Sequence, residues 1–329
     1  MIEKVLPDVY RLEIPLPQNP LKAVNSYVIK GEDRNLIIDT GLNRKECKDA
    51  FDSGLDELGI KREETDLFIT HLHADHFGLV GYLASESSKV YFNRPDSEII
   101  EAKGHWNRMV NYAGQNGFPE EELQNAIRNH PGVKFAGDWM PDLSILSEGD
   151  TIQAGDYLFE CVETPGHSLG HICLYEREKK ILVSGDHILI DITPNIQCWS
   201  DSMDSLTNYL ESLDKVNALE IDIVLPGHRR LIKDCRQRIK ELKEHHKNRL
   251  NEVLSILQDD HQTAFDVAAH MTWDINYASW DLFPVSQKWF ATGEAIAHLR
   301  CLEERGQIKR RKENGTNYFA LTNKGHSPV

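Results

Sequence analysis

The sequence lacks the features that mark membrane and exported proteins. No apolar run approaches the roughly 18 uninterrupted residues that a membrane-spanning helix needs. The first residues, Met1 to Lys4, are not a basic segment followed by an apolar stretch, which is the pattern of a secretion signal. No low-complexity tract is long enough to suggest disorder. These absences predict a globular chain with no membrane partner, and we expect it in the cytoplasm.

Paired cysteines and an excess of positive charge are also missing. The six cysteines lie far apart and none belongs to a CxxC pair, so we expect buried free thiols rather than disulfides. The 37 Lys and Arg residues are outnumbered by 52 Asp and Glu residues, which gives a formal net charge of −15. Because nucleic acid is bound mainly through its phosphates, this charge opposes non-specific attraction to it, although a local basic patch is compatible with it.

The first 230 residues alternate short β-branched runs with longer amphipathic stretches. Eight runs predict strands: Val24 to Ile29, Asn35 to Asp39, Leu67 to Thr70, Lys89 to Phe92, Tyr157 to Glu163, Ile172 to Tyr175, Ile181 to Ser184 and Ile221 to Leu225. Five stretches predict helices: Arg44 to Leu58, Gly78 to Ser85, Asp96 to Ala113, Pro119 to His130 and Ser202 to Asn217. This alternation is typical of an α/β fold, and we expect two packed sheets with outer helices, an αββα sandwich, over residues 1–235.

A second, smaller domain is predicted over residues 236–329. Its parts are a charged connecting helix from Arg236 to about Leu257, a short helix from Thr263 to Met271, a longer helix from Gln287 to Arg305, and two strands between Ile308 and Leu321. Thr263 could cap the short helix, and Asn314-Gly315 favours a hairpin turn. Helices followed by a hairpin predict a winged-helix-like module.

A mainly helical insertion is expected in the first domain at about residues 95–145. Its aromatic and other large side chains are His105, Trp106, Met109, Tyr112, Phe118, Phe135, Trp139 and Met140. They could form a lid or the wall of a substrate pocket, or they could be ordinary core, and the sequence leaves both interpretations open. Aromatic residues of the second domain could likewise close over the site or form a homodimer interface.

The densest group of metal-competent side chains is the segment from Thr70 to His76, which reads THLHADH. It places His71, His73, Asp75 and His76 within six residues, directly after the apolar run Leu67 to Ile69. Neutral imidazole and carboxylate groups are suitable ligands for zinc and similar divalent metals. One buried histidine is usually a core residue, but four such groups after a predicted strand predict a metal site.

Three later segments share the same context, in which a polar residue follows an apolar run and a glycine. They are Thr164 to His167, Ser184 to His187 and Leu225 to His228. A glycine allows the backbone to turn sharply, so the next side chain can point back to a common centre. The expected ligands are His167, Asp186 and His228. His187 follows Asp186 directly, and because adjacent side chains of an extended chain point in opposite directions, we assign it to packing or to support of the ligands.

Together these segments resemble the motif series of the metallo-beta-lactamase superfamily, including its HxHxDH signature, over roughly residues 5 to 235. The resemblance implies a first metal held by His71, His73 and His167. It implies a second metal held by Asp75, His76 and His228, with Asp186 bridging the two. An early Asp-Thr-Gly turn also matches, at Asp39 to Gly41, where Asp39 would support the ligands.

The resemblance implies a hydrolase with two divalent ions, zinc first and manganese or iron as alternatives. A hydroxide that bridges the ions would attack the substrate, and Asp75 could orient it or carry a proton to the leaving group. The pattern is most similar to the branch of glyoxalase II and β-lactamase-like protein 2, whose members often carry a C-terminal winged-helix-like domain. This implies a small acyl substrate, such as a thioester, a lactone or a related ester.

Several alternatives remain open. A metal-dependent ribonuclease or phosphodiesterase is the main rival, with a basic segment from Lys309 to Lys312 as its support and the acidic composition against it. The complete set of seven ligands disfavours the single-iron enzymes that oxidise sulfur compounds, and no appended flavin-binding sequence supports electron transfer. The intact site also opposes a purely regulatory protein, since unmatched buried charges are costly without an ion.

Overall fold

The computed structural model describes the chain except for residues 136–140, 259–260, 275–276 and 323–329. It divides into two compact units, each built from several segments. The first contains Met1–Glu101, Pro131–Pro194 and Ser212–Ile239, and the second contains Ala102–His130, Asn195–Glu211 and Lys240–Val329. The insertion expected at 95–145 is therefore shared between the units, and the single boundary expected after residue 235 stays a prediction.

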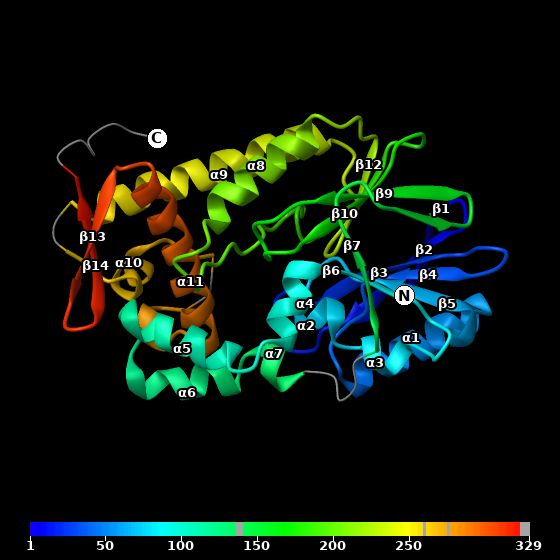
Figure 1. The fold of residues 1–329 in the computed structure, drawn as a ribbon, viewed down its shortest axis with the longest axis horizontal. Coiled ribbons are helices and arrows are strands. Elements are labelled where there is room, and N and C mark those ends of the chain that lie inside the picture. The colour runs from blue at the N-terminus through cyan, green and yellow to red at the C-terminus, as the bar shows by residue number, and fades with distance from the viewer. Residues whose placement is uncertain (136–140, 259–260, 275–276, 323–329) are drawn as a thin grey trace. The chain divides into compact units, whose positions relative to one another are not determined.

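Two sheets form the centre of the first unit (Figure 1). The larger sheet has seven strands in sequence order: β1 (Ile2–Leu6), β2 (Val9–Pro15), β3 (Ala23–Ile29), β4 (Asn35–Ile38), β5 (Thr65–Phe68), β6 (Val90–Asn93) and β7 (Leu143–Leu146). The smaller sheet has the order β12-β11-β10-β9-β8, with β8 (Thr151–Ala154), β9 (Tyr157–Glu163), β10 (Ile172–Glu176), β11 (Ile181–Gly185) and β12 (Ile223–Pro226).

Apolar side chains of the two sheets share one core. Phe68 and Ile38 of the larger sheet belong to the same buried cluster as Phe159, Leu174 and Val183 of the smaller one. A second buried cluster joins the other face of the larger sheet to the helices α1 (Lys45–Leu58) and α3 (Val80–Leu83). The second half of α8 (Ser205–Asn217) is attached to the segment that follows β9 of the smaller sheet, because Ser212 Oγ donates a hydrogen bond to the carbonyl of Pro165, at 2.9 Å. The α/β class with packed sheets and outer helices is confirmed.

Strand direction determines where functional residues gather. Strands β4, β5 and β6 pair in parallel, so their carboxyl ends meet at one edge of the larger sheet. Strands β11 and β12 are also parallel, which does the same in the smaller sheet. Ligands of α/β sheets bind outside the carboxyl ends of the strands. The Asp39, His71 and His76 segments follow β4 and β5, and the Asp186 and His228 segments follow β11 and β12.

Short helices complete the first unit: η1 (Arg62–Glu64), α2 (Ala74–Phe77), α4 (Arg94–Glu101) and α7 (Pro131–Lys134). The second unit contains α5 (His105–Gln115), α6 (Glu120–Arg128), most of α9 (Cys235–Ile256), α10 (Ala264–His270), η2 (Trp280–Leu282), α11 (Val285–Glu304), and the antiparallel hairpin β13 (Ile308–Glu313) and β14 (Thr316–Leu321). Thr263 caps α10 in a capping box with Asp266, as expected. Helices α9, α10 and α11 and the hairpin follow one another in the predicted order, and the winged-helix class stays a prediction.

Aromatic side chains form the core of the second unit. Trp289 is fully buried and stacks on Trp199 with 4.2 Å between ring centroids. Met109 and Phe118 of the expected insertion pack in the same cluster. These two residues are therefore core within their unit, and Phe135 packs against the larger sheet of the first unit. Trp139 and Met140 lie outside the described residues.

The structure corrects one expected helix. Residues 96–113 form two helices instead of one, because α4 ends at Glu101 and Gly104 has a φ of 73°, a left-handed conformation that a continuing helix does not adopt. Strands β1, β2, β7 and β8 were not expected from the sequence. All six cysteines are buried free thiols, as predicted. Among the described helices, none is both long and apolar enough to cross a membrane.

Candidate metal centre

The seven predicted ligands come together at the edge where the parallel strands end. His71 and His73 lie in the turn after β5, and Asp75 and His76 lie in α2. The other three follow strands of the smaller sheet: His167 after β9, Asp186 after β11 and His228 after β12. The described residues contain three sets whose possible ligand atoms all lie within 4.8 Å of one another: His71, His73 and His167; His71, His76 and Asp186; and Asp75, His76 and His228.

Asp186 lies between the histidines of the first and the third of these sets, which we call the two outer sets. Its Oδ1 is 3.4 Å from His76 Nε2, and its Oδ2 is 3.6 Å from His167 Nε2 and 3.5 Å from His228 Nε2. His228 Nε2 is also 3.5 Å from Asp75 Oδ2. A tetrahedral zinc ion bound at about 2.1 Å separates its ligand atoms by about 3.4 Å. These spacings therefore fit ligands that share a cation.

Several of the converging atoms are buried without a hydrogen-bond partner. They are His76 Nε2, His228 Nε2 and Asp186 Oδ1. The other ring nitrogen of each histidine is engaged, since His76 Nδ1 is 2.8 Å from Asp39 Oδ2 and His228 Nδ1 is 2.7 Å from the carbonyl of Ala23. Buried polar atoms rarely lack partners, and each costs free energy when it does. The donor set, its spacing and these atoms without a hydrogen bond fit a divalent cation.

Asp39 orients two ligand segments at once. It follows β4 with a left-handed φ of 58°, and its carboxylate accepts hydrogen bonds from the backbone N–H of Thr70, at 2.8 Å, and from the Thr70 hydroxyl. Thr70 Oγ1 is in turn 2.9 Å from His71 Nδ1. Together with the contact to His76, this places Asp39 behind the predicted ligands, which is the position that the resemblance implied. Such partners fix the orientation and the protonated nitrogen of a ligating histidine.

The segment that carries His228 is held just as closely. Asn25 Nδ2 donates to the carbonyls of Pro226, at 2.9 Å, and Arg229, at 2.8 Å. Gly227 is required for steric reasons, because a Cβ atom there would lie 2.5 Å from Asp186 Oδ1 and 2.8 Å from His76 Cε1. The sequence Pro-Gly-His thus leaves room for a neighbouring ligand as well as making a turn.

The charges divide the histidines into two kinds. Burial and the nearby His167 lower the pKa of His73 to about 3, so its imidazole is neutral. Burial would also lower the pKa of His228, but Asp186 and Asp75 beside it raise that pKa to about 10. The pKa of His76 is also well above its ordinary value. Burial would lower this pKa, but the nearby Asp186, Asp39 and Asp75 raise it by more. A cation at these carboxylates would therefore replace protons on the histidines.

His171 has no metal-like context in the sequence, which indicates a structural or surface histidine, and the structure places it directly behind the site. It is fully buried, and its Nε2 accepts a hydrogen bond from the backbone N–H of Asp186, at 3.2 Å. Its Nδ1 is 2.8 Å from the hydroxyl of Thr164. His187 is buried too, with its ring centroid 6.1 Å from that of His171, and it belongs to none of the three described ligand sets.

Asp96 was missed as a site residue. It is fully buried in the first turn of α4, and its carboxylate accepts hydrogen bonds from Leu72, Ser168 and Gly170. Burial raises its pKa to about 6, against the lowering effect of these hydrogen bonds. In the sequence it looks like an ordinary acid at the start of a helix. The one signal that could have found it was its position after β6, which runs parallel to the strand that precedes the THLHADH segment.

Comparison with known proteins agrees with this geometry. The sequence model of the Metallo-beta-lactamase superfamily matches residues 19–228, and that of the Metallo-beta-lactamase-like C-terminal domain matches residues 250–322. The probable metallo-hydrolase YqjP of Bacillus subtilis is 26% identical over 328 residues, which cover 95% of this chain and 97% of that protein. The acyl-coenzyme A thioesterase MBLAC2 of Gallus gallus is 29% identical over 214 residues, which cover 62% of this chain and 72% of that protein.

Solved structures show the same architecture. The crystal structure of a metallo-beta-lactamase family protein from Thermus thermophilus has a TM-score of 0.83 and 27% identity, covering 97% of this chain and 100% of that one. The superfamily match spans more than half of the chain and contains all seven predicted ligands. The chain therefore belongs to the metallo-beta-lactamase superfamily, as a metal-dependent hydrolase with an additional C-terminal domain.

Proposed function

We propose that this protein hydrolyses small acyl substrates, thioesters first and lactones or related esters next, at a centre of two divalent cations. The observation that carries the proposal is the position of Asp186, whose carboxylate oxygens lie 3.4–3.6 Å from His76, His167 and His228, histidines of both outer ligand sets. The choice of a thioester rests on the likeness to a protein named as an acyl-coenzyme A thioesterase. Zinc is the first choice of metal, with manganese and iron as alternatives.

Each side chain has a separate task in this proposal. His71, His73 and His167 would hold one cation, and Asp75, His76 and His228 the other, with Asp186 shared. Bound there, the cations would activate a water molecule for attack and polarise the substrate carbonyl. A neutral imidazole, such as that of His73, can donate a nitrogen lone pair to a cation. Asp39 keeps His76 oriented through the contact at Nδ1.

Asp75 is the acid best placed to act on water. Its side chain is 17% exposed, compared with 9% for Asp186. Although burial would raise its pKa, the neighbouring His76 and His228 hold it below the ordinary value, so the group is a carboxylate at neutral pH. A carboxylate can accept a hydrogen bond from the attacking water and pass its proton to the leaving group. Asp75 is therefore proposed as the orienting and proton-transferring residue.

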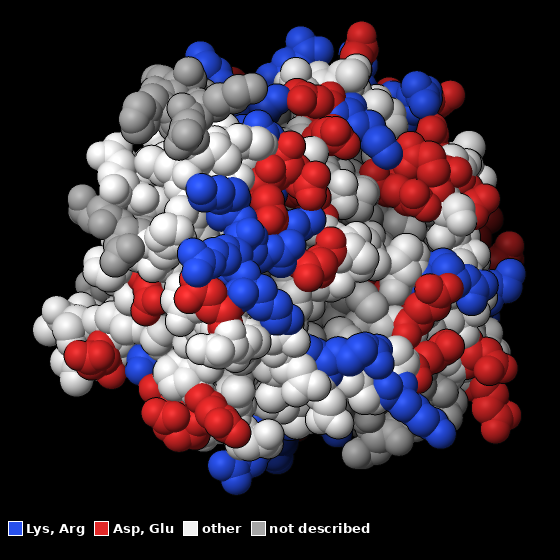
Figure 2. Space-filling model, turned by 60° about the vertical axis from the view of Figure 1, so that its left-hand side comes forward, with Lys and Arg blue, Asp and Glu red and all other residues white. Residues whose placement is uncertain are grey.

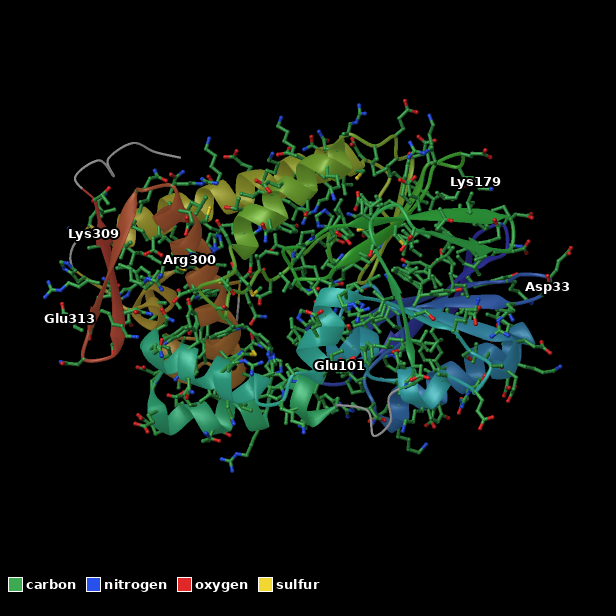
Figure 3. All side chains as sticks on the ribbon, viewed as in Figure 1. Asp33, Glu101, Lys179, Arg300, Lys309 and Glu313 are labelled. Carbon is green, nitrogen blue, oxygen red and sulfur yellow. The ribbon has the colours of Figure 1, made fainter. Side chains whose placement is uncertain are left out.

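A phosphodiesterase or ribonuclease is the second candidate, because of the basic strand β13. Lys309, Arg311 and Lys312 are exposed there, and Figure 3 labels Lys309 and Glu313 toward the two ends of the strand. Acidic groups offset part of this charge, since Arg310 bonds to Asp201 and Glu303, and Arg311 lies 2.8 Å from Glu313. Figure 2 shows a group of basic side chains with acidic ones around it. The acyl substrate is therefore preferred.

Metal analysis combined with a panel of substrates tests the proposal. The panel contains acyl thioesters, lactones, a β-lactam, phosphodiesters and single-stranded RNA, and the variants are His73→Ala and Asp186→Ala. His270→Ala is the matched control, because His270 is an exposed histidine outside the described ligand sets. About two metals per chain, with thioester or lactone turnover lost in both variants but kept in the control, is the expected result. Cleavage of RNA or phosphodiesters alone would establish the second candidate, and no bound metal would overturn both.

A further inference from the structure

Asp96 links the two segments that carry one of the ligand sets. Its Oδ2 accepts hydrogen bonds from the backbone N–H of Leu72, at 3.0 Å, and from the hydroxyl of Ser168, at 2.8 Å. Its Oδ1 accepts from the backbone N–H of Gly170, at 2.8 Å. Leu72 lies between His71 and His73, and Ser168 follows His167. One carboxylate thus holds both segments of the His71, His73 and His167 set.

The other outer set has different anchors. His76 is held by Asp39 through Nδ1, and His228 is held by the carbonyl of Ala23. Among the described residues, the hydrogen bonds of the Asp96 carboxylate go to the segments around Leu72 and Ser168 and not to Asp75, His76 or His228. A change at Asp96 should therefore act first on one half of the centre.

The surroundings of Asp96 leave little room for adjustment. Its backbone N–H donates to Asn93 Oδ1, at 2.7 Å, which fixes the first turn of α4. A Cβ atom at Gly170 would collide with the Asn93 side chain and would lie 2.9 Å from the backbone nitrogen of Asp96. The helix start and the segment after His167 are therefore in close contact, and the carboxylate cannot shift without moving one of them.

An acid in the first turn of a helix often serves only the helix dipole. Such residues are normally exposed, because burying a carboxylate is costly unless hydrogen bonds compensate it. Asp96 is fully buried, and its three donors outside the helix come from two other parts of the chain. Helix stabilisation alone does not account for this arrangement.

We propose that Asp96 is a positioning residue that sets the geometry of the cation site formed by His71, His73 and His167, and not that of the site formed by Asp75, His76 and His228. This inference rests on the two-cation centre of the proposed function. Carboxylates that orient ligands without touching the metal typically contribute 10-fold to 100-fold in affinity, and we expect an effect of roughly that size here.

The test is a titration of Zn²⁺ and Co²⁺ against a competing chelator, with Asp96→Asn as the main variant. The amide has the same shape but keeps one acceptor oxygen, so it loses at least one of the three hydrogen bonds. We expect one of the two metal sites to weaken roughly 10-fold to 100-fold, with a changed Co²⁺ absorption spectrum. Asp66→Asn is the matched control, since Asp66 accepts from the backbone N–H of Lys89 and from Arg34 at the opposite end of β5.

Two further backgrounds identify the affected site. In His228→Ala, which keeps the first set, adding Asp96→Asn should weaken the remaining ion by the same factor. In His167→Ala, which keeps the second set, adding Asp96→Asn should change the affinity for the remaining ion by less than about twofold. Ser168→Ala removes a single donor and should give a smaller loss confined to the first site, so it tests the inference even where Asp96→Asn does not fold.

The outcomes separate the two proposals. Fewer than two metals bound by the unaltered protein would contradict the two-cation centre itself. If the unaltered protein binds two metals, but Asp96→Asn and Ser168→Ala weaken both sites equally or weaken neither site, the role of Asp96 is overturned. The two-cation centre would still stand in that case. An equal loss in Asp66→Asn would also overturn it, since a general loss of stability would then explain the effect.

Discussion

Replacing Gly227 with alanine would put a methyl group inside the proposed metal centre. The added Cβ would lie 2.5 Å from Asp186 Oδ1, and ordinary contacts of a Cβ begin at 3.4 Å, so the two atoms must separate by about 0.9 Å. Backbone surrounds the position as well, because the carbon of the Gly185 carbonyl would be 3.2 Å away. The shift cannot be absorbed by a flexible side chain alone.

A displacement of this size is large for a metal site. Ligand distances in such sites hold to about ±0.2 Å, and a misplacement of about 1 Å can cost a factor of roughly 100 in rate. We expect Gly227→Ala to lower hydrolysis about 100-fold and to reduce bound metal. The cost of overpacking in unfolding free energy should be about 1–3 kcal/mol.

The assay compares turnover, metal content and thermal unfolding with those of Gly114→Ala. Gly114 lies within α5, where an added Cβ would meet only Leu123 Cδ1, at an ordinary 3.5 Å. Gly114 is the next-to-last residue of α5, so we expect that control to keep full activity and to change in stability by at most about 1 kcal/mol, the most that alanine gains over glycine within a helix. If Gly227→Ala kept normal turnover and metal content, the close approach of Gly227 to Asp186 and His76 would be refuted.

Other predictions follow from the same contacts. Asp39→Ala should weaken metal binding roughly 10-fold to 100-fold by releasing His76, as measured by chelator competition. Because the pKa of His228 is raised to about 10, binding of a cation must displace its proton, so apparent metal affinity should rise with pH between about 6 and 9, by up to about tenfold per unit for each proton displaced. An affinity that falls or stays flat over that range would contradict the protonated site. In the second unit, Trp289→Ala should cost about 3–5 kcal/mol in chemical denaturation, because the side chain is fully buried against Trp199.

The convergence of the seven candidate ligands could be predicted from sequence because each of these residues carries its signal locally, and their role as ligands stays a prediction. His71, His73, Asp75 and His76 are concentrated in one short segment, and His167 and His228 each follow a Pro-Gly pair. The resemblance to a known motif series then ordered them into two sites. Asp39 was found among the supporting residues through the same motif series, but Asp96 and His171 belong to no motif and their partners are distant in the chain. Asp96 meets Ser168 across 72 positions, and His171 meets Asp186 across 15.

The fold was predictable to a similar degree. Strand β9 has several β-branched, aromatic and other apolar residues in a partly alternating burial pattern, and β11 begins with the buried apolar run Ile181 to Val183, so both were found nearly to the residue. Strands β1, β7 and β8 have only four or five residues and partly exposed patterns, so their hydrophobic periodicity is weak. The single helix expected over 96–113 was wrong because apolar residues keep a helical spacing on both sides of Gly104. The helical backbone conformation is nevertheless interrupted at Gly104.

Each proposed cation site draws its ligands from both sheets. His71 and His73 follow the larger sheet and His167 follows the smaller one, and the second set joins Asp75 and His76 to His228 in the same way. A bound cation would therefore tie together two sheets that otherwise meet through apolar side chains such as Phe68 and Phe159. Since a ligand that binds only the folded state stabilises it by about 4 kcal/mol at roughly 1,000 times its Kd, part of the cohesion of this sandwich should depend on metal. By the same linkage, a change that loosens the core between the sheets should weaken metal binding even though it touches no ligand.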